Sequence, residues 1–157
     1  SGLMLVARTA KARERFLTQW ATIVSERKYE AIVEGNIEQD MGLVQNYLKD
    51  ADNYEVISTD NPKDGGELAK TRYKVIERSP RFTRVELSMR HGHKNQLRVH
   101  MKDLGCPISG DRKYGGRANG IHRLALHATR LCFEHPITGQ KMAFESPIPA
   151  NFLTLLR

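Results

Sequence analysis

The strongest constraint on the fold of this chain is a pair of adjacent strand patterns near its middle. Residues 70–77 read KTRYKVIE and residues 83–89 read TRVELSM, and in the second segment apolar residues alternate with polar ones. Such alternation is typical of a strand with one buried face. The link between the two segments is short and contains Ser79 and Pro80, so we expect an antiparallel hairpin.

Two other segments have helical spacing. Between residues 9 and 23, apolar residues recur every three to four positions, which predicts an amphipathic helix with Thr9 as its N-cap. In residues 94–105, three apolar side chains share one helical face and Gly105 provides a natural C-terminal stop.

The remaining strand patterns do not alternate regularly with helices, as they would in a parallel βαβ sheet. Residues 36–68 give the weakest pattern, with NPKDGG at 61–66 as a clear turn. We therefore predict one domain over residues 1–157, of the α+β class, with a mixed, mainly antiparallel sheet and flanking helices. Further strands are expected at residues 2–8 (GLMLVAR), 28–35 (KYEAIVEG), within 124–136 (LALHATRLCFEHP) and at 141–147 (KMAFESP), with a terminal helix over 149–157 (PANFLTLLR).

Composition excludes several classes of protein. With 39% apolar and 27% charged residues, the chain has the balance of an ordinary globular domain. No apolar run is long enough to cross a bilayer, so no membrane association is expected. Cys106 and Cys132 are the only cysteines, and reduced thiols in a cytoplasmic protein are the simplest interpretation.

The net charge of +7 is unevenly distributed. Residues 36–68 contain eight acidic residues and two lysines, whereas residues 70–102 contain ten Lys and Arg residues and two glutamates. A basic region beside an acidic one indicates a surface for a polyanion such as a nucleic acid. The alternative is that strands with one solvated face collect lysine and arginine without any partner.

A metal site can be assembled from His91, His93, Cys132 and His135, but the pattern is weak. Zinc sites usually contain paired cysteines at short spacing, and each cysteine here stands alone. A helical H-E-x-x-H motif is also missing. We therefore expect no metal, and we expect the histidines to be polar contacts or core residues. Nucleophilic hydrolysis is set aside as well, because there is no G-x-S-x-G motif and Cys106 precedes a proline.

Two residues remain open from the local pattern. Arg98 would lie beside the buried face of the second helix, where it can hold a carboxylate in a two-pronged pair, or it is simply an exposed arginine on a basic helix. Tyr29 follows two cations at the start of a strand. It suits stacking on a flipped base, or it is a tyrosine packed in the core.

Five segments, taken in order, resemble the RluA-type pseudouridine synthases. These segments are SGLMLVARTAKA, RKYEAIVEG, GHKNQLRVHMKDLGCPISGDRKYGG, RLALHATRLCFEHPITG and SPIPANF. The resemblance runs nearly from end to end, and its longest block spans residues 92–116. It implies an isomerase that converts uridine to pseudouridine in structured RNA, ribosomal or transfer, without cofactor or metal.

The resemblance also implies site residues. Tyr29 matches the tyrosine that stacks on the target base, and Arg98 matches the arginine that pairs with the catalytic aspartate. The residues expected to contact the substrate are Lys28, Asn95, Gln96, Leu124 and Leu126. In the family Asn95 is often replaced by histidine and His93 by arginine.

The family signature is H-R-L-D-x-x-T-S-G, and this chain begins with its last two letters, Ser1 and Gly2. We therefore expect the nucleophilic aspartate four positions ahead of Ser1, and no carboxylate partner for Arg98 within the chain. The isolated chain is then expected to be inactive, and a non-catalytic RNA-binding module on the same scaffold is the alternative. Because half of the catalytic sheet would be missing, an exposed sheet edge is expected to allow a homodimer.

Overall fold

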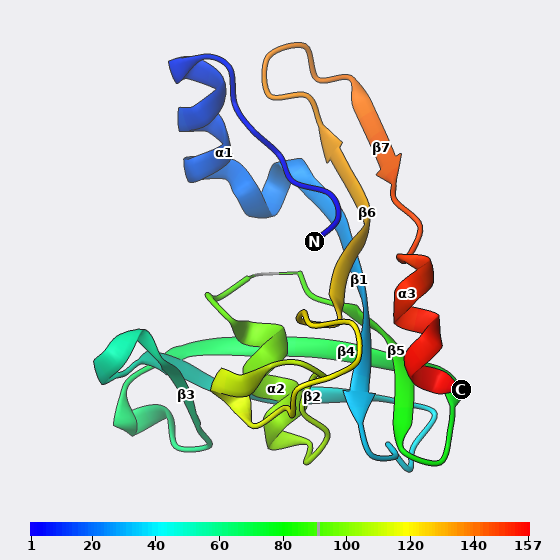
Figure 1. Cartoon of the computed structure of the whole chain (residues 1–157). Helices are drawn as coiled ribbons and strands as arrows, with labels where there is room; N and C mark the ends of the chain where they lie inside the picture. Colours follow the sequence, from blue (N-terminus) through cyan, green and yellow to red (C-terminus); the bar gives the residue numbers. More distant parts are fainter. Residues whose placement is uncertain (91) are drawn as a thin grey trace.

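The computed structural model describes residues 1–90 and 92–157, which form one seven-stranded antiparallel sheet with α-helices packed against it (Figure 1). The predicted α+β class is confirmed. The strand order is β3-β2-β4-β5-β1-β6-β7. The strands are β1 (Val24–Glu34), β2 (Met41–Asp50), β3 (Val56–Thr59), β4 (Glu67–Arg78), β5 (Phe82–Ser88), β6 (Leu126–Glu134) and β7 (Lys141–Glu145). The helices are α1 (Ala10–Ile23), α2 (Gln96–Asp103) and α3 (Ala150–Leu153), with 3-10 turns η1 (Asp52–Tyr54), η2 (Pro62–Asp64), η3 (Arg112–Tyr114) and η4 (Thr154–Leu156).

The predicted hairpin is formed by β4 and β5, whose turn is closed by the Ser79 N–H donating to the Phe82 carbonyl at 2.8 Å. β1 lies next to β5 and is also paired with β6, so both of its edges are hydrogen-bonded. It begins four residues before the predicted strand and ends at Glu34, directly before Gly35, whose φ of 84° favours glycine. β6 and β7 run across the direction of β2 and β4, so the sheet is strongly twisted (Figure 1).

α1 forms as predicted. The Thr9 side chain accepts from the Ala12 N–H at the N-terminus, which satisfies one of the unpaired donors of the first turn. Phe16 and Ile23 are buried in a small cluster with residues of β1 and β6. This cluster holds the helix against one end of the sheet.

One expectation for the strands was wrong. Residues 2–8 form no strand: only Gly2 makes an isolated parallel bridge, to Ala128 of β6. β7 already occupies the edge of β6 from Arg130 to Glu134, so little of that edge is left for pairing. Conversely, the weak stretch 36–68 forms β2 and β3. β2 was hard to detect because its outward side chains are largely exposed and only Asn46 and Leu48 are buried.

α3 covers part of the sheet face opposite α2 (Figure 1). Phe152 is fully buried and packs edge-on against His127, which is paired with Glu30 of β1. β3 and β7 are the edge strands of the described sheet, and the homodimer across an edge stays a prediction. No helix in the described part of the chain is long and apolar enough to span a membrane.

α2 is fixed to the sheet by a continuous chain of hydrogen bonds. Gln96 Nε2 donates to Thr71 Oγ1 at 3.0 Å, and this hydroxyl lies 2.8 Å from His100 Nδ1. His100 Nε2 lies 2.9 Å from Asn46 Oδ1, and Asn46 Nδ2 donates to Asp103 Oδ2 at 3.0 Å. Because the Asn46 oxygen can only accept, His100 carries its proton on Nε2 and accepts from Thr71 at Nδ1. His100 is thus a core residue, as expected.

This chain of hydrogen bonds predicts a pH-dependent stability. His100 has no exposed surface, and burial lowers its pKa from 6.5 to about 4, although Asp103 opposes the shift. Since the folded-state pKa lies below the unfolded one, the stabilisation is complete above pH 6.5 and is lost as the pH falls toward 4. We expect His100 to account for a loss of about 2 kcal/mol in unfolding free energy between pH 8 and pH 5, measured by urea denaturation.

The variant His100→Gln should lose less unfolding free energy between pH 8 and pH 5 than the wild type. The variant His122→Gln, at an exposed histidine, should lose as much as the wild type. A profile that stays equally steep in His100→Gln would show that other groups cause the loss.

Candidate active site

Arg98, in the first turn of α2, is the centre of one group of polar side chains. Its Nε and Nη2 each donate to a different carboxylate oxygen of Asp111 at 2.7 Å. The Asp111 side chain is 1% exposed and that of Arg98 is 24% exposed. The hydrogen bonds with Asp111 raise the pKa of Arg98 above its ordinary value, against the effect of burial. The expectation that the chain contains no carboxylate partner for Arg98 is therefore wrong.

Asn95 and Tyr114 complete this group. The Arg98 guanidinium lies over the Tyr114 ring, 4.8 Å from its centroid, and Nη1 donates to Asn95 Oδ1 at 3.0 Å. The Tyr114 hydroxyl accepts from the Asn95 amide at 3.2 Å and from the backbone N–H of Val56 in β3 at 3.0 Å. The side chain of Asn95, predicted to contact substrate, is thus bonded within the protein.

The glycine-rich loop after α2 places Asp111 beneath Arg98. Gly110 has a φ of 81°, and a Cβ on it would lie 2.3 Å from the Arg123 carbonyl oxygen. Asp111 then caps η3 by accepting from the Tyr114 N–H at 3.3 Å. Neither Asp111 nor Tyr114 was predicted from the sequence as a site residue. The signal that could have found them is the acid and the aromatic residue enclosed by glycines in GDRKYGG.

Gln96, also predicted to contact substrate, is buried. Its amide nitrogen donates to the Lys70 carbonyl and to Thr71 Oγ1, each at 3.0 Å, and its oxygen accepts from the His93 N–H at 3.0 Å. The structure therefore places Gln96 between α2 and β4, where it supports the helix.

Tyr29 and Leu126 lie on the sheet face that α2 covers, and Leu124 belongs to the same hydrophobic cluster. Tyr29, Leu124 and Leu126 are half-buried and pack against the same hydrophobic cluster, to which α2 contributes Leu97. Tyr29 is aligned with Ala128 across the β1–β6 ladder, two residues from Leu126. One aromatic ring and two leucines thus pack against one hydrophobic cluster, whereas the Arg98 guanidinium contacts Asp111, Asn95 and Tyr114.

The first residues of the chain lie beside this group. The Ser1 backbone nitrogen donates to the Leu126 carbonyl at 3.1 Å, and the Ser1 hydroxyl lies 2.9 Å from His127 Nδ1. Gly2 runs parallel to β6 at Ala128. Followed from Gly2 to Ser1, the backbone therefore runs along β6 in the direction of Leu124.

Lys28 lies on the other face of the sheet. It is adjacent to Tyr29 in β1, and successive side chains of a strand point to opposite faces. Its ammonium group is 3.3 Å from Glu86 and 3.7 Å from Glu26. The structure does not bring Lys28 together with Tyr29, although the sequence assigned both to one site.

The metal alternative gains no support from the described residues, among which no group of three or more His, Cys, Asp or Glu side chains could hold an ion. His91, which belongs to that alternative, lies outside the described residues. Cys132 Sγ instead donates to Glu26 Oε2 at 3.5 Å.

The pair of Arg98 with Asp111 predicts that removing its buried carboxylate lowers the unfolding free energy more than removing an exposed one. Asp111→Asn leaves the half-buried Arg98 without an anionic partner, and we expect unfolding free energy to fall by roughly 2 kcal/mol in urea denaturation. The control is Asp50→Asn, which removes the exposed partner of Lys94 at 3.9 Å and should cost less than about 1 kcal/mol. Equal losses in the two variants would contradict a stabilising role for the buried pair.

Known proteins share this sequence and fold. The chain is 38% identical over 157 residues to the Uncharacterized RNA pseudouridine synthase YlyB of Bacillus subtilis. It is 33% identical over 169 residues to the Ribosomal large subunit pseudouridine synthase D of Vibrio cholerae. Each match covers 99% of this chain and 51% of the relative, so the chain spans about half the length of the curated relatives it matches.

The solved structure of Human RNA Pseudouridylate Synthase Domain Containing 1 superposes with a TM-score of 0.72 at 22% identity, covering 87% of this chain and 58% of the human chain. Human RNA Pseudouridylate Synthase Domain Containing 4 gives a TM-score of 0.67 at 24% identity, over 90% and 63% of the two chains. Residues 1–103 match the family model described as RNA pseudouridylate synthase. The RluA-type resemblance is confirmed, and the chain belongs to the RNA pseudouridylate synthase family.

Proposed function

We propose that the protein containing this chain is a pseudouridine synthase that isomerises uridine to pseudouridine in structured ribosomal or transfer RNA. Family membership supports the reaction, and the name of the Vibrio cholerae relative, which refers to the large ribosomal subunit, supports an RNA substrate. In this reaction the bond between ribose C1′ and uracil N1 breaks, and a bond between C1′ and C5 forms. C5 loses a proton to solvent and N1 regains one, so the composition is unchanged and no cofactor is required.

The observation that carries this proposal is the position of Ser1. Its backbone is hydrogen-bonded to Leu126 and directed along β6 toward Leu124. Four residues span at most about 14 Å, so an aspartate four positions ahead of Ser1 would stay near the apolar group that contains Tyr29. A nucleophile at that position would lie next to a target nucleotide whose base is flipped out of the RNA base stack.

The residues of this chain then have separate roles. The Tyr29 ring stacks on the flipped uracil, and its hydroxyl takes part in proton removal from C5. The apolar side chains of Leu124 and Leu126 line the pocket and exclude water from the sugar carbon that is attacked. Arg98, held by Asp111, orients the carboxylate of the nucleophile, and Gln96 and Asn95 act on the substrate only through the helix that they hold in place.

The first test compares the isolated 157 residues with the full-length protein, using release of tritium from RNA that contains 5-tritiated uridine. We expect the isolated chain to give background release and the full-length protein to turn over. Replacing the upstream aspartate by asparagine in the full-length protein should return the release to background. Turnover by the isolated chain would refute the upstream nucleophile. RNA binding by the full-length protein without tritium release would favour the non-catalytic module.

The second test separates Tyr29 from other tyrosines. Tyr29→Phe in the full-length protein keeps the ring but removes the hydroxyl, so we expect kcat to fall by roughly 100-fold or more with little change in KM. Tyr73→Phe is the matched control, because Tyr73 lies on the same sheet face but is buried in the core. An equal kcat for the two variants would exclude the Tyr29 hydroxyl from proton transfer.

A further inference from the structure

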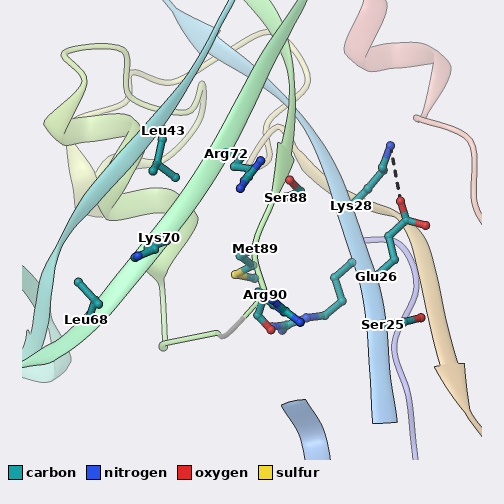
Figure 2. Close-up of a pocket in the computed structure, with 11 residues that line it drawn as sticks. Ser25, Glu26, Lys28, Leu43, Leu68, Lys70, Arg72, Ser88, Met89 and Arg90 are labelled. Carbon is teal, nitrogen blue, oxygen red and sulfur yellow. Dashed lines mark hydrogen bonds and ion pairs between the residues drawn. The ribbon is translucent and has the colours of Figure 1, made fainter. Parts of the chain in front are cut away.

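The sheet face opposite Tyr29, which α3 covers only in part and which we call the open face, contains a cleft of about 710 Å³. Figure 2 shows side chains from β1, β2, β4 and the end of β5 arranged around it. Its wall crosses four neighbouring strands in register: Leu43 is aligned with Arg72, Arg72 with Ser88, and Ser88 with Lys28. The cleft is therefore built on regular sheet, which fixes the spacing of its side chains. We call it the cationic groove.

The lining of the cationic groove is strongly basic. Five of its side chains are cationic and one, Glu26, is anionic; the cations are Arg27, Lys28, Lys70, Arg72 and Arg90. Lys28 is neutralised by Glu26 and Glu86. Within the described part of the chain, the exposed side chains of Lys70, Arg72 and Arg90 have no carboxylate partner.

Arg27 is held in place by neighbours that are not carboxylates. Its guanidinium lies 5.3 Å from the centroid of the Trp20 ring, and Nη2 donates to the Arg90 carbonyl at 3.4 Å. A Cβ on Gly92 would lie only 2.8 Å from Arg27 Nη1, so glycine at this position leaves room for the guanidinium. The positive charge of Arg27 is thus fixed at the rim of the groove, and none of the described residues is its carboxylate partner.

We propose that the cationic groove binds the phosphate backbone of the substrate RNA, outside the nucleotide that is modified. The inference rests on the proposed function, since it takes RNA as the polyanion. Lys70 and Arg72 alternate along one strand, which sets them roughly 7 Å apart and allows them to contact neighbouring phosphates. Residues 92–95 lead from the rim of the groove to the start of α2, so RNA bound in the groove can reach the other face over this short segment.

Charge favours RNA over a protein partner for this groove. An apolar partner would bury three cations without counter-ions, which costs several kcal/mol for each charge. A phosphate backbone supplies the missing anions and stays partly solvated. The exposed Leu43 and Leu68 at the groove edge can contact ribose rings without requiring further polar groups.

The test measures how tightly the full-length protein binds a fluorescein-labelled RNA hairpin with uridines in its loop. The signal is the fluorescence anisotropy of the labelled RNA. Replacing Lys70→Glu together with Arg72→Glu should raise Kd by at least about tenfold at low salt. It should also reduce the slope of log affinity against log salt by about 1.5, because two phosphate contacts are lost. Lys70→Gln with Arg72→Gln should give a smaller loss in the same direction.

The matched control is Lys11→Glu with Arg13→Glu on the exposed side of α1, which makes the same change in net charge far from the groove lining. It should change Kd by less than about threefold, and circular dichroism should show all variants folded. If the wild-type protein binds RNA and the groove variants bind as the control does, the groove proposal is overturned while the proposed function stands. If the wild-type protein neither binds RNA nor releases tritium, both proposals fail.

Acylation of lysines in the full-length protein provides an independent measurement. Lys70 should react readily without RNA and be protected when the hairpin is added, whereas Lys11 should react equally in both states. Protection of Lys70 before RNA is added would show that another part of the protein fills the groove, and would overturn the proposal.

Discussion

β1 is the strand on which both proposed sites depend, because it contains Tyr29 and Lys28 and its register is fixed by hydrogen bonds on both edges. β5 is aligned along one edge and β6 along the other, so its register cannot shift without breaking two ladders. Since side chains alternate along a strand, Tyr29 lies on the face covered by α2 while Lys28 lies on the open face. The candidate active site and the cationic groove are thus two consequences of one register, and a slip of one residue would exchange them.

The elements predicted correctly are those whose signals are local. The helix of residues 10–23 has its cap and apolar face within its own sequence, and the hairpin of β4 and β5 has a short turn between alternating strands. β2 was missed because its burial depends on β4, β3 and α2, all distant in sequence. Residues 2–8 were wrongly predicted as a strand because their pattern cannot reveal that β7 already occupies the edge of β6.

The sequence proposed the members of the site, and their roles stay predictions, whereas their arrangement could not be read from local pattern. Tyr29, Leu124 and Leu126 pack against one hydrophobic cluster. Of the two alternatives for Arg98, the structure shows the two-pronged pair with a carboxylate, but the partner is Asp111, thirteen residues further along and not a residue outside the chain. That contact forms only because the chain turns at Gly105 and Gly110, both with positive φ, and returns beneath α2. Spacing along a helix contains no information about such a return.

The bond between Arg98 and Asp111 also determines what a second carboxylate at this site would experience. A guanidinium has five N–H donors, and Asp111 and Asn95 engage three of them. Two donors remain to orient the carboxylate of the proposed nucleophile. Because Asp111 already neutralises the charge of Arg98, that carboxylate would gain direction from hydrogen bonds but little net electrostatic attraction.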